Sequence, residues 1–245
     1  MEENKVEKDV LDEVTNSVEN EEMPVTPVIQ NVEKKEQVMA LKVKADPEDI
    51  SAEDRKIAVK RLAGAISHSI RTSGEVDVRA FGAAAISKAS KALAISFKYV
   101  ETANLHLGCA PAFITAKIGD NELTGMCFRA FATPIREDQK NKDYTKTKSV
   151  LKVTADPKDI TPEDRKIKLK ALASAITHSA KENNEVLVRA FGSSAISKTV
   201  KAISVARGKI ALTGLDLYTF PLFIVADMNG SERTGIAFYV YTNAM

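Results

Sequence analysis

The sequence predicts an α+β protein with two layers, built from two tandem domains that each follow the order β-α-β-α-β-β. The first observation is an internal repeat. Residues 41–132 align with residues 151–242 at a constant offset of 110, and 43 of these 92 positions are identical. A repeat of this length is a whole domain, because a chain of about 90 residues can bury a modest core. The second observation is that each copy alternates short strand-like segments with two longer segments of helical spacing.

The repeat divides the chain into four parts. They are an acidic disordered tail (1–38), a first domain (39–132), a charged linker (133–148) and a second domain (149–245). The tail has no aromatic residue and holds 11 Asp and Glu, which is typical of disorder. Its valines and Leu11 also fall on a helical stripe, so the alternative is a short helix that folds on a partner or on the domains. As a coil, the linker spans roughly 20–24 Å, enough for the domains to lie side by side.

The second copy shows the first half of the domain most clearly. Residues 151–155 alternate in polarity and predict a strand. Thr161 provides an N-cap and Pro162 the first helical position, so we expect a helix from there to about Lys181. Two asparagines end the helix, and residues 185–191 form the next strand. A crossover of this kind predicts two parallel strands with a right-handed connection.

The second half of the domain starts at Gly192, which breaks the strand. We expect a helix from Ser193 to about Ala206, with Gly208 as its C-terminal cap. An Asn-Gly turn then joins two strands, and a short extra strand precedes them; these three segments are 223–227, 234–241 and 215–219. Both helices should cover one face of a small mixed sheet. We hypothesise that the two domains pack as an intramolecular pseudo-dimer.

Composition and charge exclude several classes of protein. No window approaches the uncharged apolar length that a membrane span needs, and the acidic start lacks the apolar segment of a secretory signal. Cys109 and Cys127 cannot build a disulfide framework, so we expect a reducing, cytoplasmic setting. Residues 1–38 carry a net charge of −7, which leaves 31 basic and 22 acidic groups on the rest of the chain. A net charge of +9 on that part permits a polyanionic partner.

A series of short motifs in the second copy resembles the stage V sporulation protein S (SpoVS) family. The motifs are Ala206-Arg207-Gly208, Gly214-Leu215-Asp216-Leu217, Pro221-Leu222-Phe223 and Gly230-Ser231-Glu232-Arg233-Thr234. The resemblance covers most of each repeat and implies an Alba-like fold. Alba proteins bind DNA and RNA as dimers without enzymatic activity, so the resemblance also implies nucleic-acid binding. The first copy departs from the pattern, since Phe97 and Leu123 replace Arg207 and Arg233.

The junction between strand, glycine and helix is the candidate site in each copy. After Gly192, the free amides at the start of a helix favour an anion. Basic side chains flank the two junctions: Arg189, Lys198, Lys201, Arg207, Lys209 and Arg233 in the second copy, and Arg79, Lys88 and Lys91 in the first. Together they would neutralise several phosphates, which gives salt-sensitive binding to DNA or RNA with low sequence specificity. The alternative is that the glycine serves packing and the lysines are solvated.

Other candidate groups have simpler interpretations. Phe81 and Phe191 follow strands and could stack on a base, but they are more typical of core aromatic residues. His68 and His178 occupy equivalent helix positions and are interpreted as polar surface. The acidic clusters before each first helix could take magnesium, but acids at a helix start explain them better. We therefore predict neither a metal nor a cofactor.

The sequence contains no nucleophile elbow, phosphate-binding loop or metalloprotease motif, so we predict that the protein is not an enzyme. The first interpretation is a nucleic-acid-binding protein with a regulatory role. The alternative is a structural or scaffold protein, in which the duplicated domain binds proteins or self-associates and the tail is a docking segment. A weaker alternative is an enzyme that acts on a small anion at the junctions after Gly82 and Gly192.

Overall fold

The computed structural model of the protein describes residues 38–118, 120–228 and 230–244. The predictions for the acidic tail fall on residues outside these ranges. The first repeat consists of β1 (Ala40–Val43), α2 (Ala52–Ser73), β2 (Glu75–Ala80), α3 (Ala83–Glu101), β3 (Leu105–Ile118) and β4 (Asn121–Pro134). The second consists of β5 (Val150–Val153), α4 (Pro162–Asn183), β6 (Glu185–Ala190), α5 (Ser193–Ala211), β7 (Leu215–Met228) and β8 (Ser231–Ala244). The order β-α-β-α-β-β is confirmed in both repeats.

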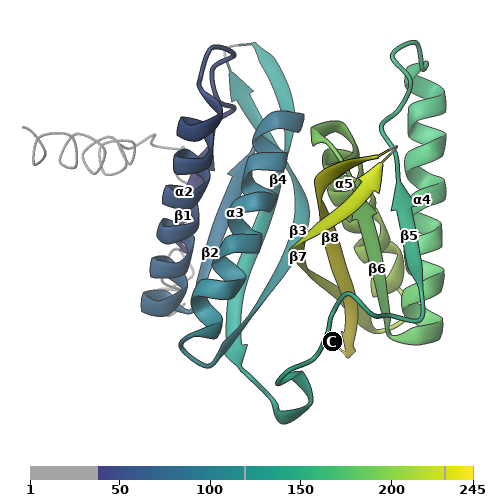
Figure 1. Ribbon diagram of the computed structural model, residues 1–245. Helices are drawn as coiled ribbons and strands as arrows, with labels where there is room; N and C mark the ends of the chain where they lie inside the picture. Colours follow the sequence, from purple (N-terminus) through teal and green to yellow (C-terminus); the bar gives the residue numbers. More distant parts are fainter. Residues whose placement is uncertain (1–37, 119, 229, 245) are drawn as a thin grey trace, which may run out of the picture. The chain divides into compact units, whose positions relative to one another are not determined.

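The strands of both repeats join in one mixed sheet with the order β1-β2-β4-β3-β7-β8-β6-β5 (Figure 1). β1 and β5 pair in parallel with β2 and β6, as the predicted crossover through a helix requires. β3 and β7 meet at the centre of the sheet through one residue pair, Cys109 and Thr219. The buried Cys109 thiol also donates to the Thr219 carbonyl at 3.0 Å. The two repeats therefore form the pseudo-dimer that the duplication suggested.

Helix α4 begins and ends where the sequence predicts. The Thr161 hydroxyl accepts from the Asp164 amide at 3.1 Å, which satisfies one free donor of the first turn. Asn184 follows the helix in the left-handed region at φ 59°, where asparagine is tolerated. On the next strand, Val186 and Val188 are fully buried. Both α4 and α5 pack against this strand, so helices and sheet form two layers.

The predicted end of the second helix is wrong. Helix α5 continues past Ala206 and through Gly208 to Ala211. A glycine inside a helix costs about 1 kcal/mol relative to alanine. The extra turn buries Ile210 completely, and burial of such a side chain contributes about 1.5–3 kcal/mol, so packing outweighs the local preference.

The two strands predicted at 215–219 and 223–227 are in fact one strand. β7 runs without interruption from Leu215 to Met228 and includes Pro221. Proline lacks a backbone N–H donor. It is tolerated in a strand only where no neighbouring strand needs a hydrogen bond from that position. Because β7 pairs with β3 through a single residue, most of this edge has no ladder that a proline could break. Met228 and Ser231 pair across the predicted two-residue turn.

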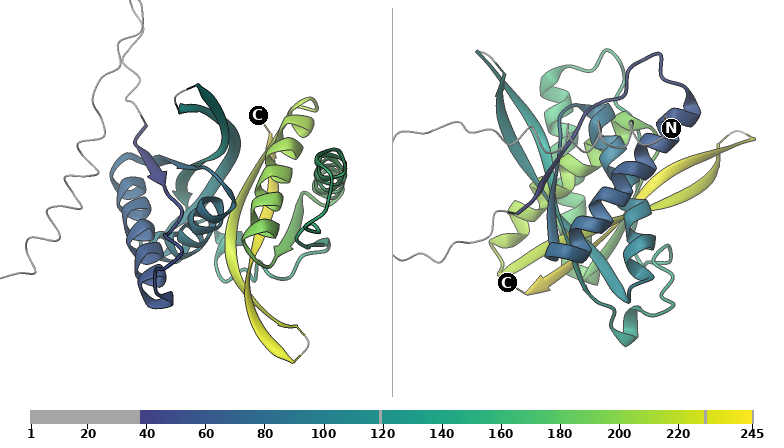
Figure 2. Two further views of the ribbon diagram at one scale, coloured as in Figure 1. Left: turned by 90° about the horizontal axis from the view of Figure 1, so that it is seen from above. Right: turned by 90° about the vertical axis from the view of Figure 1, so that its left-hand side faces the viewer.

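The right-hand view of Figure 2 shows the β3–β4 and β7–β8 hairpins extending beyond the helices in different directions.

The linker packs against the second repeat instead of forming a free coil. Residues Glu137–Gln139 form a short 3-10 helix. The Lys142 ammonium donates to the Tyr239 hydroxyl at 2.7 Å and lies 3.1 Å from the Glu185 carboxylate. The Tyr144 ring packs edge-on against Phe220, with 4.9 Å between centroids.

Among the helices that the structure describes, none combines the length and the apolar content that crossing a bilayer demands.

Candidate functional site

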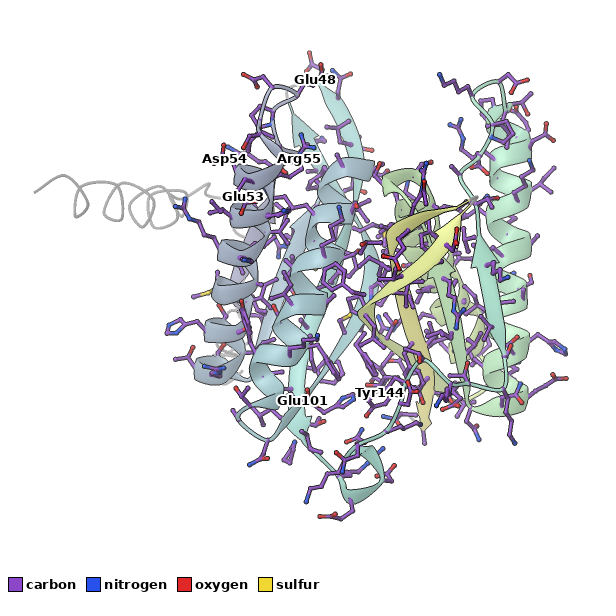
Figure 3. All side chains as sticks on the ribbon, in the orientation of Figure 1. Glu48, Glu53, Asp54, Arg55, Glu101 and Tyr144 are labelled. Atoms are coloured by element: carbon purple, nitrogen blue, oxygen red, sulfur yellow. The ribbon has the colours of Figure 1, made fainter. Side chains whose placement is uncertain are left out.

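A cleft of about 900 Å³ lies between the first repeat and the second. The first repeat supplies one wall, from the loop before α2 and from the facing sides of α2 and α3. The second repeat supplies the other wall, from the start of α5 and from the β7–β8 hairpin. The residues that line the cleft include Asp46, Glu48, Arg55, Lys56, Val59, Lys60, Lys88, Lys91, Ile95, Gly192, Ser193, Ile196, Phe223 and Ile236. Figure 3 labels Glu48 in the loop before α2 and Arg55 in the first turn of α2, with Arg55 on the side nearer α3.

The cleft is composite, and this arrangement was not predicted. The sequence groups Gly192 with the lysines of its own helix, Lys198 and Lys201. The structure instead brings Gly192 and Ser193 to the same cleft as Lys88 and Lys91 of the other repeat. The reason is that α3 and α5 pack against each other across the centre of the molecule. The strand–glycine–helix junction of the second repeat therefore lies beside lysines of the first repeat and not only beside those of its own helix.

The start of α5 offers backbone donors to this cleft. Gly192 stands at φ 84°, a conformation that glycine adopts without strain, and a Cβ there would meet no atom within 4 Å. No side chain caps the helix, and its first turn holds no acidic residue. The first amides are therefore left for solvent or for an anion.

Two of the predicted lysines are held in ion pairs. Lys198 lies 2.5 Å from Asp156, and both side chains are largely buried. Lys88 makes the equivalent pair with Asp46. Arg55 and Arg165 approach the same two carboxylates at 3.9 and 4.0 Å. In each repeat, the acid that the sequence analysis assigned to the helix start thus fastens the preceding loop to the second helix.

Arg207 is also engaged by a carboxylate. Its guanidinium donates to both oxygens of Asp216, at 2.7 and 2.8 Å. Burial alone would raise the pKa of Asp216, but the hydrogen bonds from Arg207 and from the Leu217 amide outweigh it and keep the pKa below its usual value. The hydrogen bonds to Asp216 raise the pKa of Arg207 in turn. In the first repeat the equivalent pair is Phe97 and His106, whose rings meet edge to face at 5.4 Å.

The other predicted residues remain more open. Lys201 and Lys91 are half-buried, and no acidic side chain of the described residues lies within 4.0 Å of either. Arg233 is exposed on β8. Lys209 donates to the Ser174 hydroxyl at 2.7 Å. Arg79 lies 3.4 Å from Asp77, and this carboxylate also accepts from Arg129 at 3.0 Å.

Arg189 and the two aromatic residues after the strands have distinct surroundings. The Arg189 Nε is buried and has no hydrogen-bond partner among the described residues. Phe191 packs on the backbone of Gly235, where an added Cβ would lie 2.6 Å from the ring, and Phe81 packs on Gly125 in the same way. Both rings therefore serve packing, as the simpler interpretation had it.

Sequence reasoning missed two residues of the cleft. Lys60 lies on α2, and Phe223 lies on β7 with 40% of its surface exposed. Both have identical counterparts at an offset of 110, namely Lys170 and Phe113. Their identity in the two copies was the only signal that the sequence offered for either residue. The described residues contain no group of three His, Cys, Asp or Glu side chains arranged to hold a metal ion.

The fold and the comparison with known families agree on the class of protein. The molecule is a tandem repeat of a small α+β domain whose halves share one sheet. The model of the family Stage V sporulation protein S (SpoVS) matches residues 50–133 and 165–243, one segment in each repeat. The two matches cover about two thirds of the chain, so the protein belongs to the SpoVS family and carries the domain twice.

Proposed function

We propose that the protein is a non-enzymatic nucleic-acid-binding protein with a regulatory role, which contacts phosphates of DNA or RNA with low sequence specificity. The observation that carries the proposal is the set of cations at the composite cleft and the adjoining helices that have no acidic partner among the described residues. The SpoVS family is not a known enzyme family. Contacts to phosphate supply most of the affinity of non-specific binding, and they require only accessible positive charge.

The predicted basic residues divide into two groups on this basis. Arg79, Lys88, Lys198 and Arg207 each have a carboxylate partner, so their charge is already neutralised within the fold. The remaining residues are left for phosphates. Lys91, Lys201 and Arg233 are the strongest members of this second group, and Arg189 and Lys209 complete it. Lys60, which was not predicted from the sequence, joins them at the cleft.

Fluorescence anisotropy of labelled DNA and RNA, as duplexes and as single strands, tests the proposal across a salt series. The full chain should bind with an affinity that falls steeply as salt rises. The double substitution of Lys91 and Lys201 by alanine should reduce the slope of log affinity against log salt by about 0.7–0.9 for each phosphate that the variant no longer neutralises.

A matched control separates a site from a general effect of charge. Lys181 lies in the last turn of α4, where it is exposed, and it does not line the cleft. The double substitution of Lys181 and Lys168, which is also exposed on α4 and outside the cleft, by alanine removes the same number of positive charges and should leave the slope unchanged. If the Lys91 and Lys201 variant binds like the wild type, or if the full chain binds no nucleic acid even at low salt, the proposal is wrong.

A scaffold role is the second candidate, and one observation favours it. The carboxylates of Asp46, Asp77, Asp156 and Asp216 pair with four of the nine predicted basic residues, so the surface is less positive than the sequence suggests. In this case the repeats would bind protein partners, and residues 1–38 would be a docking segment. A pull-down that loses its partner when the acidic residues of 1–38 are replaced by Asn and Gln would support this role over the first.

A further inference from the structure

The composite cleft combines an apolar wall with positive charge at its edge. Val59 and Ile95 of the first repeat face Ile196 and Ile236 of the second across it. Lys60 and Lys91 stand on the first-repeat side, and the uncapped start of α5 stands opposite. Its volume of about 900 Å³ falls within the range typical of small-molecule sites. A ligand that fits these features has a flat apolar part and at least one anionic group.

Phe223 adds a partly exposed aromatic ring to the apolar wall. It is paired in register with Ile236, which is buried, yet 40% of the Phe223 surface remains exposed. Since it lines the cleft, the exposed part of its ring is available to a ligand rather than to the core. An aromatic ring at the wall of a basic cleft is the usual platform for a nucleobase, because every base has a π-face.

The positive charge at the edge is not neutralised by the acids nearby. Asp46 already pairs with Lys88 and approaches Arg55. Lys56 pairs with Glu53 at 3.2 Å. Lys60 and Lys91 have no acidic side chain within 4.0 Å among the described residues, and Glu48 is the remaining acid of the lining. The two lysines and the amides of α5 therefore lie where a phosphate group would be held from both sides.

We infer that this cleft binds one nucleotide unit, with its base on Phe223 and its phosphate between Lys60, Lys91 and the start of α5. The unit has two sources, a free nucleoside monophosphate or an unstacked nucleotide of a single strand. For the strand, the inference rests on the proposed function and narrows it to single-stranded nucleic acid, because a base inside a duplex cannot reach a recessed ring. For the free nucleotide, it stands independently of that function.

The test compares three probes on the full-length protein. Thymidine 5′-monophosphate and inorganic phosphate are titrated by calorimetry, and a 3′-labelled (dT)₁₀ strand with a 5′-phosphate is titrated by anisotropy. Removal of one base–aromatic stack corresponds to an affinity about 5- to 150-fold lower. We expect Phe223→Ala, and separately the Lys60 and Lys91 double alanine variant, to cause a decrease of this order for at least one nucleotide probe. Inorganic phosphate should bind more weakly than the monophosphate.

Matched variants of the other repeat are the controls. Phe113→Ala and Lys170→Ala remove the counterparts of Phe223 and Lys60 at an offset of 110 and should leave nucleotide affinity within about twofold. Phe223→Leu keeps apolar packing on the hairpin without a π-face, and its unchanged melting temperature would show that the decrease in affinity does not come from unfolding.

The outcomes distinguish the inference from the proposed function. Binding of the monophosphate that depends on Phe223 supports the inference with the free nucleotide as source, even if no strand binds. Dependence seen with the strand alone supports it with the strand as source. Strand binding that is insensitive to Phe223, or equally sensitive to Phe113, overturns the inference and leaves the proposed function standing. If the monophosphate and the strand both fail to bind, the inference is overturned as well.

Discussion

Phe97 of the first repeat stacks on Phe220 of the second, with ring centroids 4.8 Å apart and ring planes 13° apart. The contact joins α3 to β7 across the centre of the molecule, and Phe220 is fully buried. His106 and Tyr144 meet the same ring edge-on at 4.8 and 4.9 Å. Aromatic pairs in such offset and edge-to-face arrangements contribute beyond the area that they bury. This cluster therefore holds the two repeats and the linker together.

The first prediction concerns this cluster. The substitution Phe220→Ala should lower the free energy of unfolding by about 3–5 kcal/mol, because it removes a large buried side chain and leaves a cavity. Urea denaturation measures the change. Phe113→Ala is the control, since 43% of that side chain is exposed and its removal should cost much less. Equal effects of the two variants would show that the stacked pair does not hold the halves together.

The second prediction concerns the ion pair of Arg207 and Asp216. Breaking a charge-assisted hydrogen-bonded pair of this kind should cost about 1.5–3 kcal/mol in Arg207→Ala or Asp216→Asn. The double variant should cost less than the sum, so a double-mutant cycle gives a favourable coupling energy. Because the folded pKa of Asp216 is lowered, its contribution is present above the unfolded pKa of about 3.9 and is lost as the pH falls through the folded value. Additive single effects would contradict the prediction.

The third prediction is a dependence of stability on pH between 6.5 and 4 that comes from His106. Burial is the largest cause that lowers its pKa to about 4, the nearby charges of Arg136 and Lys142 lower it further, and Asp138 opposes them. The unfolded chain then binds a proton below pH 6.5 that the folded chain does not bind, so stability is lost as the pH falls through this range. The loss between pH 7.5 and 5 should be about 2 kcal/mol.

Urea denaturation at pH 7.5 and 5.0 measures this effect. His106→Phe should lose little stability between these two pH values, because phenylalanine keeps an aromatic ring at this position but cannot bind a proton. His68→Phe is the control, since His68 is exposed and its removal should leave the wild-type dependence in place. A wild-type protein that is equally stable at both pH values would contradict the assignment to His106.

The fourth prediction compares two glycines. Gly208→Ala should stabilise the protein by about 0.5–1 kcal/mol, because Gly208 lies inside α5 and a Cβ there meets no atom within 4 Å. Gly235→Ala should destabilise it, because the Cβ would lie 2.7 Å from the Ala190 carbonyl oxygen as well as against Phe191. Melting temperatures that shift in opposite directions are the expected result. A fall in both would show that α5 does not extend through Gly208.

Local signals in the sequence predicted most of the fold. The cap at Thr161-Pro162 and the Asn-Gly turn are decided by residues next to each other, so their physical causes can be read directly from the chain. The end predicted at Gly208 is wrong because the burial of Ile210, which carries the helix onward, is a tertiary effect. The break predicted before Phe223 failed for a related reason, since Pro221 is tolerated because β7 pairs with β3 through a single residue, which is a tertiary feature.

The candidate site was predicted less completely, because contacts between repeats have no local signature. The basic residues around Gly192 were identified from their spacing along one helix. The sequence does not show that Lys198 forms an ion pair with Asp156. It also does not show that Lys91 of the other repeat lines the same cleft as Gly192. Phe223 was missed because an isolated strand pattern does not show which face remains exposed.

The covalent joining of the two halves changes how their interface can vary. In a dimer of identical chains, one substitution appears on both sides of the twofold axis, so a favourable change on one side is forced on the other. Here Phe97 and His106 of the first repeat occupy the positions that Arg207 and Asp216 hold in the second, so equivalent positions on the two sides carry different chemistry. The halves also remain paired at any dilution, since their association is intramolecular. The two surfaces of this protein are thus free to become different while the pairing between them is kept.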